Sequence, residues 1–205
     1  MGIEEKIELL KKHFLSVRAS GNYETNFTII SGGNAVILKS NNQNLQSFCI
    51  KCPIDESLQP YVIQTKTERN QFDGLCEETL EILKEVYSPE NFVEKSIIGD
   101  IKNYIEITKY SELTQHVPKF YYPTIQQDDW ENADFIIMDY IDGEFHMIQT
   151  LYDCSPEEKF KDNKFQNVYC LFKEKGFEFG DNFECIVEKT SKRVVMIDLD
   201  GIHKL

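Results

Sequence analysis

The end of the chain carries two carboxylates at the close of an apolar run. Residues 194–197 are Val, Val, Met and Ile, and they are followed by Asp198, Leu199, Asp200 and a glycine. An apolar strand that ends in acids at a glycine turn presents carboxylates at the end of a sheet, where oxygen ligands hold a hard cation such as Mg²⁺. The simpler alternative is that this segment is only a turn in an acidic α+β protein. We therefore take Asp198 and Asp200 as candidate metal ligands.

A third acid precedes them on a loop. Asp181 and Asn182 follow a predicted helix that ends at Gly176. Both residue types favour turns, so a turn alone would explain the pair. Their position ahead of Asp198 favours a functional role, in which a second carboxylate lies beside a metal site.

A lysine stands within an apolar strand-like run. Lys51 lies in the segment SFCIKCP, where an ammonium group is costly unless an anion meets it. The alternative is an edge-strand lysine that points at water. Cys49 and Cys52 form a C-x-x-C, but residues three apart on a strand point to opposite faces. Zinc binding or thioredoxin-like chemistry is therefore not expected.

A buried lysine needs a carboxylate, and the sequence offers two. Glu106 shares the face of an apolar stripe in the segment NYIEITKYSEL, which predicts that it points inward. The alternative is that Glu106 lies at the edge of the stripe and is solvated. Glu78, beside an earlier amphipathic stripe, is the second candidate for a pair with Lys51.

A glycine pair separates two of the predicted strands. Gly32, Gly33 and Asn34 could let backbone N–H groups close on a phosphate, since glycine allows a close approach. A plain hairpin turn is the commoner cause of such a tripeptide.

The elements that must position these residues follow from periodicity and turn signals. The first is an amphipathic helix over the opening residues, which we expect to pack on the domain as a flap. Beyond Gly143 the pattern becomes helical again. We predict strands at 26–31, 35–39, 46–52, 119–125, 133–141, 183–189 and 193–201, and helices at 67–88, 101–116 and 155–176. This order is that of an α+β fold, β-rich in its first half and helical in its second.

The order of these parts resembles the protein-kinase-like superfamily, over residues 26 to 203. Residues 31–34 look like a shortened glycine-rich loop, 48–51 like the V-A-I-K strand, and 136–143 like the hinge. KEKGFEFGD resembles the end of a helix plus the catalytic loop, and 197–201 look like the D-F-G region. NYIEITKYSELTQHVPKFYY is similar to the aminoglycoside-phosphotransferase and choline-kinase-like branch.

The resemblance implies a fold and an arrangement of lobes. It implies a bilobal protein-kinase-like fold with a β-rich N-lobe and a short helical C-lobe, formed by a single domain over residues 1–205. Its parts are an N-terminal helix at 1–25, the N-lobe at 26–138, the hinge at 139–143 and a minimal C-lobe at 144–205.

The resemblance also implies a reaction and the roles of individual residues. The expected cofactors are ATP and Mg²⁺, and the acceptor is a hydroxyl of a protein or a small molecule. Lys51 holds phosphates and Glu106 orients it, while Asp181 positions or deprotonates the acceptor. The remaining nucleotide contacts are Gly32, Gly33, Asn34, Asp139 and Ile141, and the metal ligands are Asp198, Asp200, Asn182 and Glu184.

Departures from the family pattern keep a second function open. Phe179 replaces the usual histidine of the catalytic loop, and no asparagine stands five residues after Asp181, so Asn182 or Glu184 is the substitute metal ligand. The chain ends four residues after Gly201, which shortens the acceptor platform. The alternative is a pseudokinase-type binding module without transfer activity, or a kinase whose short C-lobe a partner protein completes.

The composition limits the partners. With 22 Lys and Arg against 35 Asp and Glu, the net charge is −13, which opposes binding to nucleic acid or an anionic membrane. No run is long and apolar enough to span a membrane, and the start lacks the apolar core of a signal peptide. We expect a cytosolic protein, or one in the cytosol of a host if it is a secreted effector.

Overall fold

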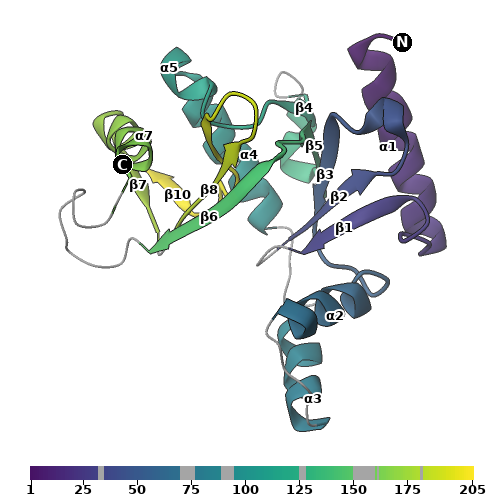
Figure 1. Ribbon diagram of the computed structural model, residues 1–205. Helices are drawn as coiled ribbons and strands as arrows, with labels where there is room; N and C mark the ends of the chain where they lie inside the picture. The colour runs from purple at the N-terminus through teal and green to yellow at the C-terminus, as the bar shows by residue number, and fades with distance from the viewer. Residues whose placement is uncertain are drawn as a thin grey trace. The chain divides into compact units, whose positions relative to one another are not determined.

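The chain folds into two compact units. The computed structural model describes residues 1–31, 35–69, 77–88, 95–124, 128–149, 160, 162–180 and 182–205 (Figure 1). The first unit comprises Met1–Ile98 and Phe120–Tyr140, and the second comprises Gly99–Lys119 and Ile141–Leu205. The chain is α+β with antiparallel sheets, as predicted.

The first unit contains a five-stranded antiparallel sheet with the order β1-β2-β3-β5-β4. The predictions of three strands followed by a later hairpin are confirmed. The strands are β1 (Phe27–Ser31), β2 (Val36–Ser40), β3 (Phe48–Cys52), β4 (Phe120–Tyr122) and β5 (Ile136–Asp139). The short 3-10 helices η1 (Gln43–Leu45) and η2 (Asp128–Asn132) lie in the connections before β3 and β5.

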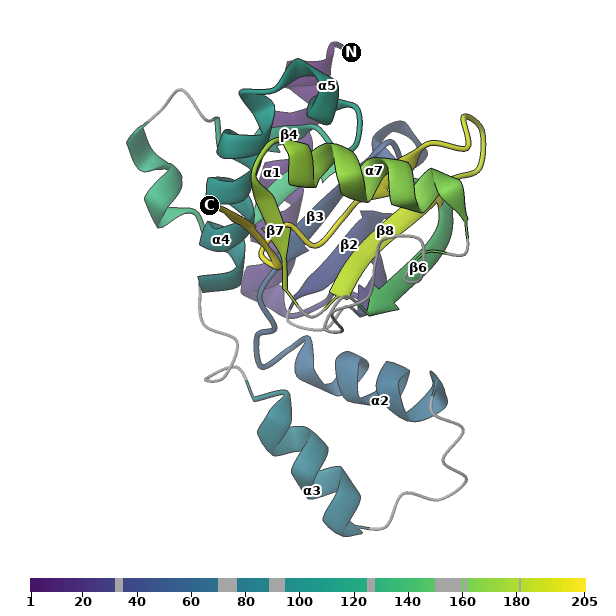
Figure 2. The same cartoon turned by 90° about the vertical axis from the view of Figure 1, so that its left-hand side faces the viewer.

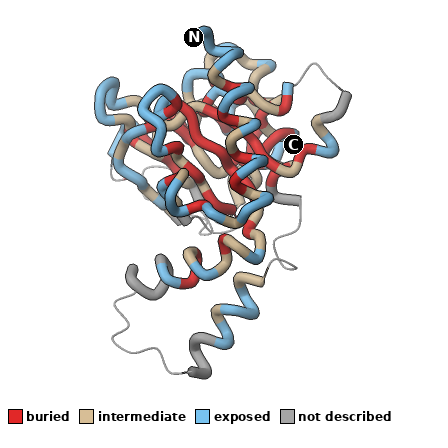
Figure 3. Tube along the Cα trace, turned by 90° about the vertical axis from the view of Figure 1, so that its right-hand side faces the viewer, coloured by how far each residue is buried: buried red, intermediate tan, exposed pale blue. Residues whose placement is uncertain are grey.

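The N-terminal helix is part of the core of this unit. Helix α1 (Ile3–Ser20) buries Ile7, Leu10, Phe14 and Val17, which belong to the same apolar cluster as the inner residues of the sheet (Figure 3). The spacing of these residues on one helix face predicts their burial. The helix is therefore a fixed layer on the sheet and not a flap.

Two further helices follow β3 in the first unit. They are α2 (Gln59–Arg69), which packs against β1, and α3 (Glu77–Val86). The predicted helix at 67–88 therefore overlaps two helices, separated by residues 70–76, which lie outside the described residues. Helix α2 was not predicted; it begins beside Pro60, a residue that the first turn of a helix tolerates.

The second unit has two small antiparallel sheets. One has the order β6-β8-β9, from β6 (Gly143–Gln149), β8 (Asn182–Glu188) and β9 (Val194–Met196), and the other pairs β7 (Phe177–Phe179) with β10 (Ile202–Lys204). The predicted final hairpin corresponds to β8 and β9. Helix α7 (Asn163–Glu174) packs against β7 and β9 (Figure 2).

Residues 143–149 form strand β6, whereas the sequence predicted a helix beyond Gly143. GEFHMIQ alternates in exposure, with Phe145 and Met147 exposed and His146 and Ile148 partly buried. This period of two is the pattern of a strand with one solvated face. The prediction that the chain turns helical directly after Gly143 is wrong, and helix is described only from Asn163.

The second unit also contains residues Gly99–Lys119, which lie in sequence between the two segments of the first unit. Helix α4 (Lys95–Thr108) runs across the boundary at Gly99, and α5 (Ser111–Thr114) follows it. The predicted helix at 101–116 covers both. The predicted hinge at 139–143 spans the boundary after Tyr140, but the predicted first lobe includes residues 99–119, which the structure groups with the second unit.

Candidate functional site

The acidic segment of the sequence follows the β8–β9 hairpin in the second unit. Val194, Val195 and Met196 of β9 are buried, and Asp198 and Asp200 are partly buried. Between these acids, Leu199 is buried and anchors the turn in the core of the unit. We call residues Asp198–Gly201 the acid loop. The buried strand fixes where the loop begins, and Leu199 fixes its middle.

Helix α4 holds the backbone of the acid loop. The Oδ1 atom of Asp100 accepts hydrogen bonds from the amides of Leu199, at 3.0 Å, and Asp200, at 3.1 Å. The Nδ2 atom of Asn103, one turn further along the helix, donates to the carbonyl of Leu199 at 2.8 Å. A carboxylate that accepts from two backbone amides is a strong, charge-assisted anchor. Three of the loop's backbone groups are therefore bonded to one helix.

The segment that contains Asp181 also meets the acid loop. The amide of Gly180 donates to the carbonyl of Gly201 at 2.8 Å, and β7, which precedes Gly180, pairs with β10, which follows Gly201. Asp181 itself lies outside the described residues. The residue directly before Asp181 and the last residue of the acid loop are thus joined within one unit.

Asp100 is a candidate site residue that was not predicted from the sequence. Its side chain is buried, with a relative exposure of 1%. The predicted helix began at residue 101, so Asp100 fell outside it. The signal was present in the spacing of Ile97, Ile101, Tyr104 and Ile107, all buried on α4, because Asp100 lies on the same side of that helix as Ile97 and Ile101.

Glu106 lies at the edge of the buried face of α4. Its carboxylate accepts a hydrogen bond from Lys109 at 2.6 Å, and the Glu106 side chain is 36% exposed. Its neighbour Ile107 is fully buried. The alternative of a partly solvated Glu106 therefore fits its surroundings better than an inward-pointing side chain. A pair between Glu106 and Lys51 stays a prediction, and the side chain of Glu78 lies outside the described part of the chain.

Lys51 lies in the middle of the sheet of the first unit. It faces Ile37 of β2 on one side and Ile136 of β5 on the other, and its relative exposure is 6%. Strand β3 is interior to the sheet, so the alternative of an edge-strand lysine is wrong. An ammonium group held in a buried strand is costly and requires anionic neighbours.

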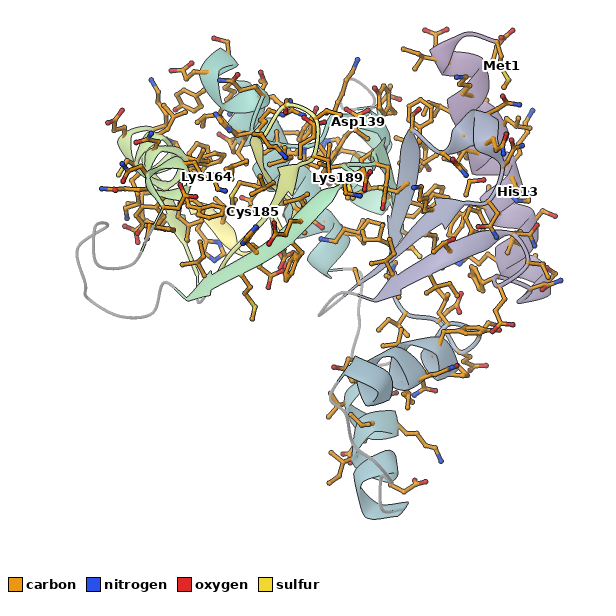
Figure 4. All side chains as sticks on the ribbon, in the orientation of Figure 1. Met1, His13, Asp139, Lys164, Cys185 and Lys189 are labelled. Atoms are coloured by element: carbon orange, nitrogen blue, oxygen red, sulfur yellow. The ribbon has the colours of Figure 1, made fainter. Side chains whose placement is uncertain are left out.

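The other predicted nucleotide contacts are described only in part. Gly32, Gly33 and Asn34 lie outside the described residues. Asp139, which is labelled in Figure 4, ends β5. Its carboxylate accepts a hydrogen bond from the Tyr121 hydroxyl at 2.9 Å, and Ile141 is buried.

Among the predicted substitutes for the metal ligands, Asn182 begins β8, but its side chain is not described. Glu184 is partly buried on β8, and its carbonyl accepts from the amide of Ile197 at 3.3 Å, which places β8 beside the start of the acid loop.

Phe179 is a packing residue. Its ring stacks on Tyr169 of α7, with centroids 5.0 Å apart, and also meets Phe172 at 5.8 Å. The family pattern places a histidine at this position. A phenyl ring between β7 and α7 contributes apolar contact there and cannot carry a proton.

Three of the cysteines in the described part of the chain are buried. Cys49 and Cys52 are free and buried, and burial raises the pKa of both thiols, that of Cys49 to about 12. Burial likewise raises the pKa of Cys185, near Lys164, to about 12 (Figure 4). A protonated, buried thiol is a poor nucleophile and ligand.

The donor atoms of the acid loop suit magnesium in kind. Asp198 and Asp200 supply carboxylate oxygens, the ligands that Mg²⁺ prefers. Among the described residues, no group of three or more His, Cys, Asp or Glu side chains is arranged to hold a cation by itself. Mg²⁺ usually binds one or two carboxylates together with substrate phosphates, so the acid loop fits a metal that arrives with a nucleotide.

Comparison with known proteins leaves the family open. No protein-family model matches the chain, and no curated protein matches it. In the described part of the chain, no helix is both long enough and apolar enough to cross a bilayer.

Proposed function

We propose that the chain is an atypical minimal kinase of protein-kinase-like fold, which transfers the γ-phosphate of ATP to a hydroxyl of a protein or small-molecule acceptor. The observation that carries the proposal is the bond between Gly180 and Gly201, because it joins the segment of the candidate catalytic acid to the loop of the candidate metal ligands. A phosphotransferase needs these two groups together.

The first unit supports the proposal through Lys51. In protein kinases a lysine on the third strand holds the nucleotide phosphates, and a glycine-rich loop covers them. Here Lys51 is buried on the third strand of the sheet, and Gly32 and Gly33 stand between β1 and β2. An ammonium kept away from water attracts phosphate more strongly than one on the surface.

In the proposed mechanism the chain acts by positioning and by neutralising charge. Lys51 binds the phosphates, Asp198 and Asp200 hold Mg²⁺, and Asp181 orients the acceptor hydroxyl. The bound Mg²⁺ supplies neutralisation of the charge on the phosphates. Asp139 and Ile141 are the proposed contacts at the end of β5 for the base of the nucleotide.

A carboxylate for Lys51 is part of the proposal. Glu106 and Glu78 are the candidates from the sequence. A double-mutant cycle separates them: the effects of Lys51→Met and of the partner's amide variant on ATP affinity are coupled only for the true pair.

The direct test is incubation of the purified protein with Mg²⁺ and γ-labelled ATP, with and without lysate proteins and small alcohols as acceptors. Transfer of label by the wild type and its loss in Asp181→Asn support the proposal. Calorimetric titration with ATP, once in the presence of Mg²⁺ and once in the presence of EDTA, measures nucleotide binding independently of transfer. A wild type that neither binds ATP nor transfers phosphate would overturn the proposal.

A pseudokinase-type binding module is the second candidate function, and the packing of Phe179 favours it. The position that precedes Gly180 carries a phenyl ring, which packs on Tyr169 and Phe172 and cannot carry a proton. ATP binding without transfer to any acceptor would select this function. Repeating the transfer assay with Phe179→His shows whether the absence of histidine at this position explains the absence of phosphate transfer.

A further inference from the structure

Three residues of α4 converge on the acid loop within the second unit. Asp100 accepts from the amides of Leu199 and Asp200, and Asn103 donates to the carbonyl of Leu199. Asp100 and Leu199 are each 1% exposed, so the bond between them is made away from water, and the other two bonds are partly buried. Buried hydrogen bonds to a charged acceptor hold geometry firmly, because losing them leaves polar groups unsatisfied.

The third residue, Gly99, makes room for a carboxylate. A β-carbon added at Gly99 would collide with the Oδ1 atom of Asp200. Glycine within a helix costs about 0.5–1 kcal/mol relative to alanine, so its presence requires a compensating reason. The close approach of the Asp200 side chain is that reason.

We propose that Gly99, Asp100 and Asn103 are positioning residues that fix the acid loop, so that Asp198 and Asp200 are oriented for a cation before it binds. Asp100 and Asn103 fix the backbone, and Gly99 leaves the space in which the Asp200 carboxylate lies. The role in cation binding rests on the proposed function, whereas the fixing of the loop does not.

The first test measures the loop without a ligand. Hydrogen–deuterium exchange of the peptide that covers residues 197–203 is compared in the wild type, Asp100→Ala, Asp100→Asn and Asn103→Ala. Asp100→Ala removes the acceptor of the Leu199 and Asp200 amides, so their exchange rises about tenfold. Asn103→Ala removes only the donor to the Leu199 carbonyl, so exchange of the peptide rises by a smaller factor. Asp100→Asn retains an oxygen acceptor and keeps most of the protection. Lys102→Ala, at an exposed position on the same helix, is the matched control.

The second test measures the magnesium-dependent part of ATP affinity by calorimetry. Asn103→Ala and Gly99→Ala lower ATP affinity in Mg²⁺ about tenfold and leave the affinity in EDTA unchanged, because only the orientation of the carboxylates is altered. Because Asn103 carries no charge, Asn103→Ala still tests the inference if Asp100→Ala does not fold.

Two results would overturn the inference. One is exchange of the 197–203 peptide that is unchanged in both alanine variants. The other is an equal fall of ATP affinity with and without Mg²⁺, which is the effect of a general loss of structure. If the wild type binds no ATP, the proposed function fails, and the exchange experiment still decides whether α4 fixes the acid loop.

Discussion

The rings of Phe14 and Phe135 lie 4.8 Å apart, centroid to centroid, so the N-terminal helix and the start of β5 share one core. Both side chains are almost completely buried. The contact joins residues 121 positions apart in sequence, numbered 14 and 135. It makes α1 a structural requirement of the first unit.

We therefore expect Phe14→Ala to lower the free energy of unfolding by about 3–5 kcal/mol, because it leaves a cavity between α1 and the sheet. Urea unfolding followed by circular dichroism measures the change. Leu15→Ala is the control, since Leu15 is 44% exposed and its loss should cost less than about 0.5 kcal/mol. Equal effects of the two substitutions would show that α1 is not part of the core.

Lys51→Met should weaken ATP binding while leaving the fold intact, because methionine keeps the apolar stem and removes the charge. Calorimetric titration with ATP and Mg²⁺ measures the affinity, and thermal unfolding checks the fold. The matched control is Lys11→Met, which removes a charge from α1 that lies over the ring of Tyr122. Unchanged affinity in Lys51→Met would remove Lys51 from the proposed site.

Asp198→Asn should abolish most of the magnesium-dependent part of ATP affinity, since it keeps the shape of the side chain and removes the charge that a hard cation requires. Titrations with Mg²⁺ and with EDTA separate the two contributions. Asp142→Asn in the same unit, at an exposed carboxylate paired with Lys189, is the control. ATP binding by the wild type that is indifferent to EDTA would contradict the metal assignment.

Asp181→Ala should lower phosphate transfer by about 100-fold or more and change ATP affinity little, because a group that positions a hydroxyl acts on the chemical step. Single-turnover transfer of label and calorimetry provide the two measurements. A fully active variant would place the catalytic carboxylate elsewhere, with Glu178 and Glu184 as the next candidates. Glu178 already pairs with Lys173 at 2.6 Å, which makes it a suitable comparison variant.

The buried thiols predict how stability responds to alkaline pH. Burial raises the pKa of Cys49 and of Cys185 from 9.0 to about 12. Between these values the unfolded chain releases protons that the folded chain keeps, so the free energy of unfolding falls as pH rises from about 9 to about 12. Denaturant unfolding at about pH 8 and pH 10.5 measures the fall.

Cys49→Ala and Cys185→Ala should each make this alkaline fall shallower. Ile50→Val is the control, because it alters the packing beside Cys49 without removing a thiol. A wild-type fall retained in full by both alanine variants would assign the alkaline sensitivity to other groups.

The sequence predicted the strands of the first sheet and the final hairpin because their apolar runs end at clear turn signals. It did not predict β6, since the exposed Phe145 and Met147 remove the expected contrast between an apolar and a polar face. The interior position of Lys51 followed from the apolar residues around it. The burial of Asp100 could be predicted from the apolar spacing on α4, but its partners could not, because hydrogen bonds to the backbone of residues 99 and 100 positions away leave no local pattern.

The discontinuity of the second unit has a consequence for dissecting the chain. Its two segments, Gly99–Lys119 and Ile141–Leu205, are separated by β4 and β5, which belong to the first unit. A C-terminal fragment that begins at Ile141 would lack Asp100 and Asn103, the hydrogen-bond partners of buried Leu199. It would also lose the bond of 2.7 Å from the Met196 amide of β9 to the His116 carbonyl. The fragment of residues 141–205 is therefore not expected to fold without residues 99–119. Complementation between a peptide of residues 95–119 and the C-terminal fragment would measure how much of the cooperativity this loop closure provides.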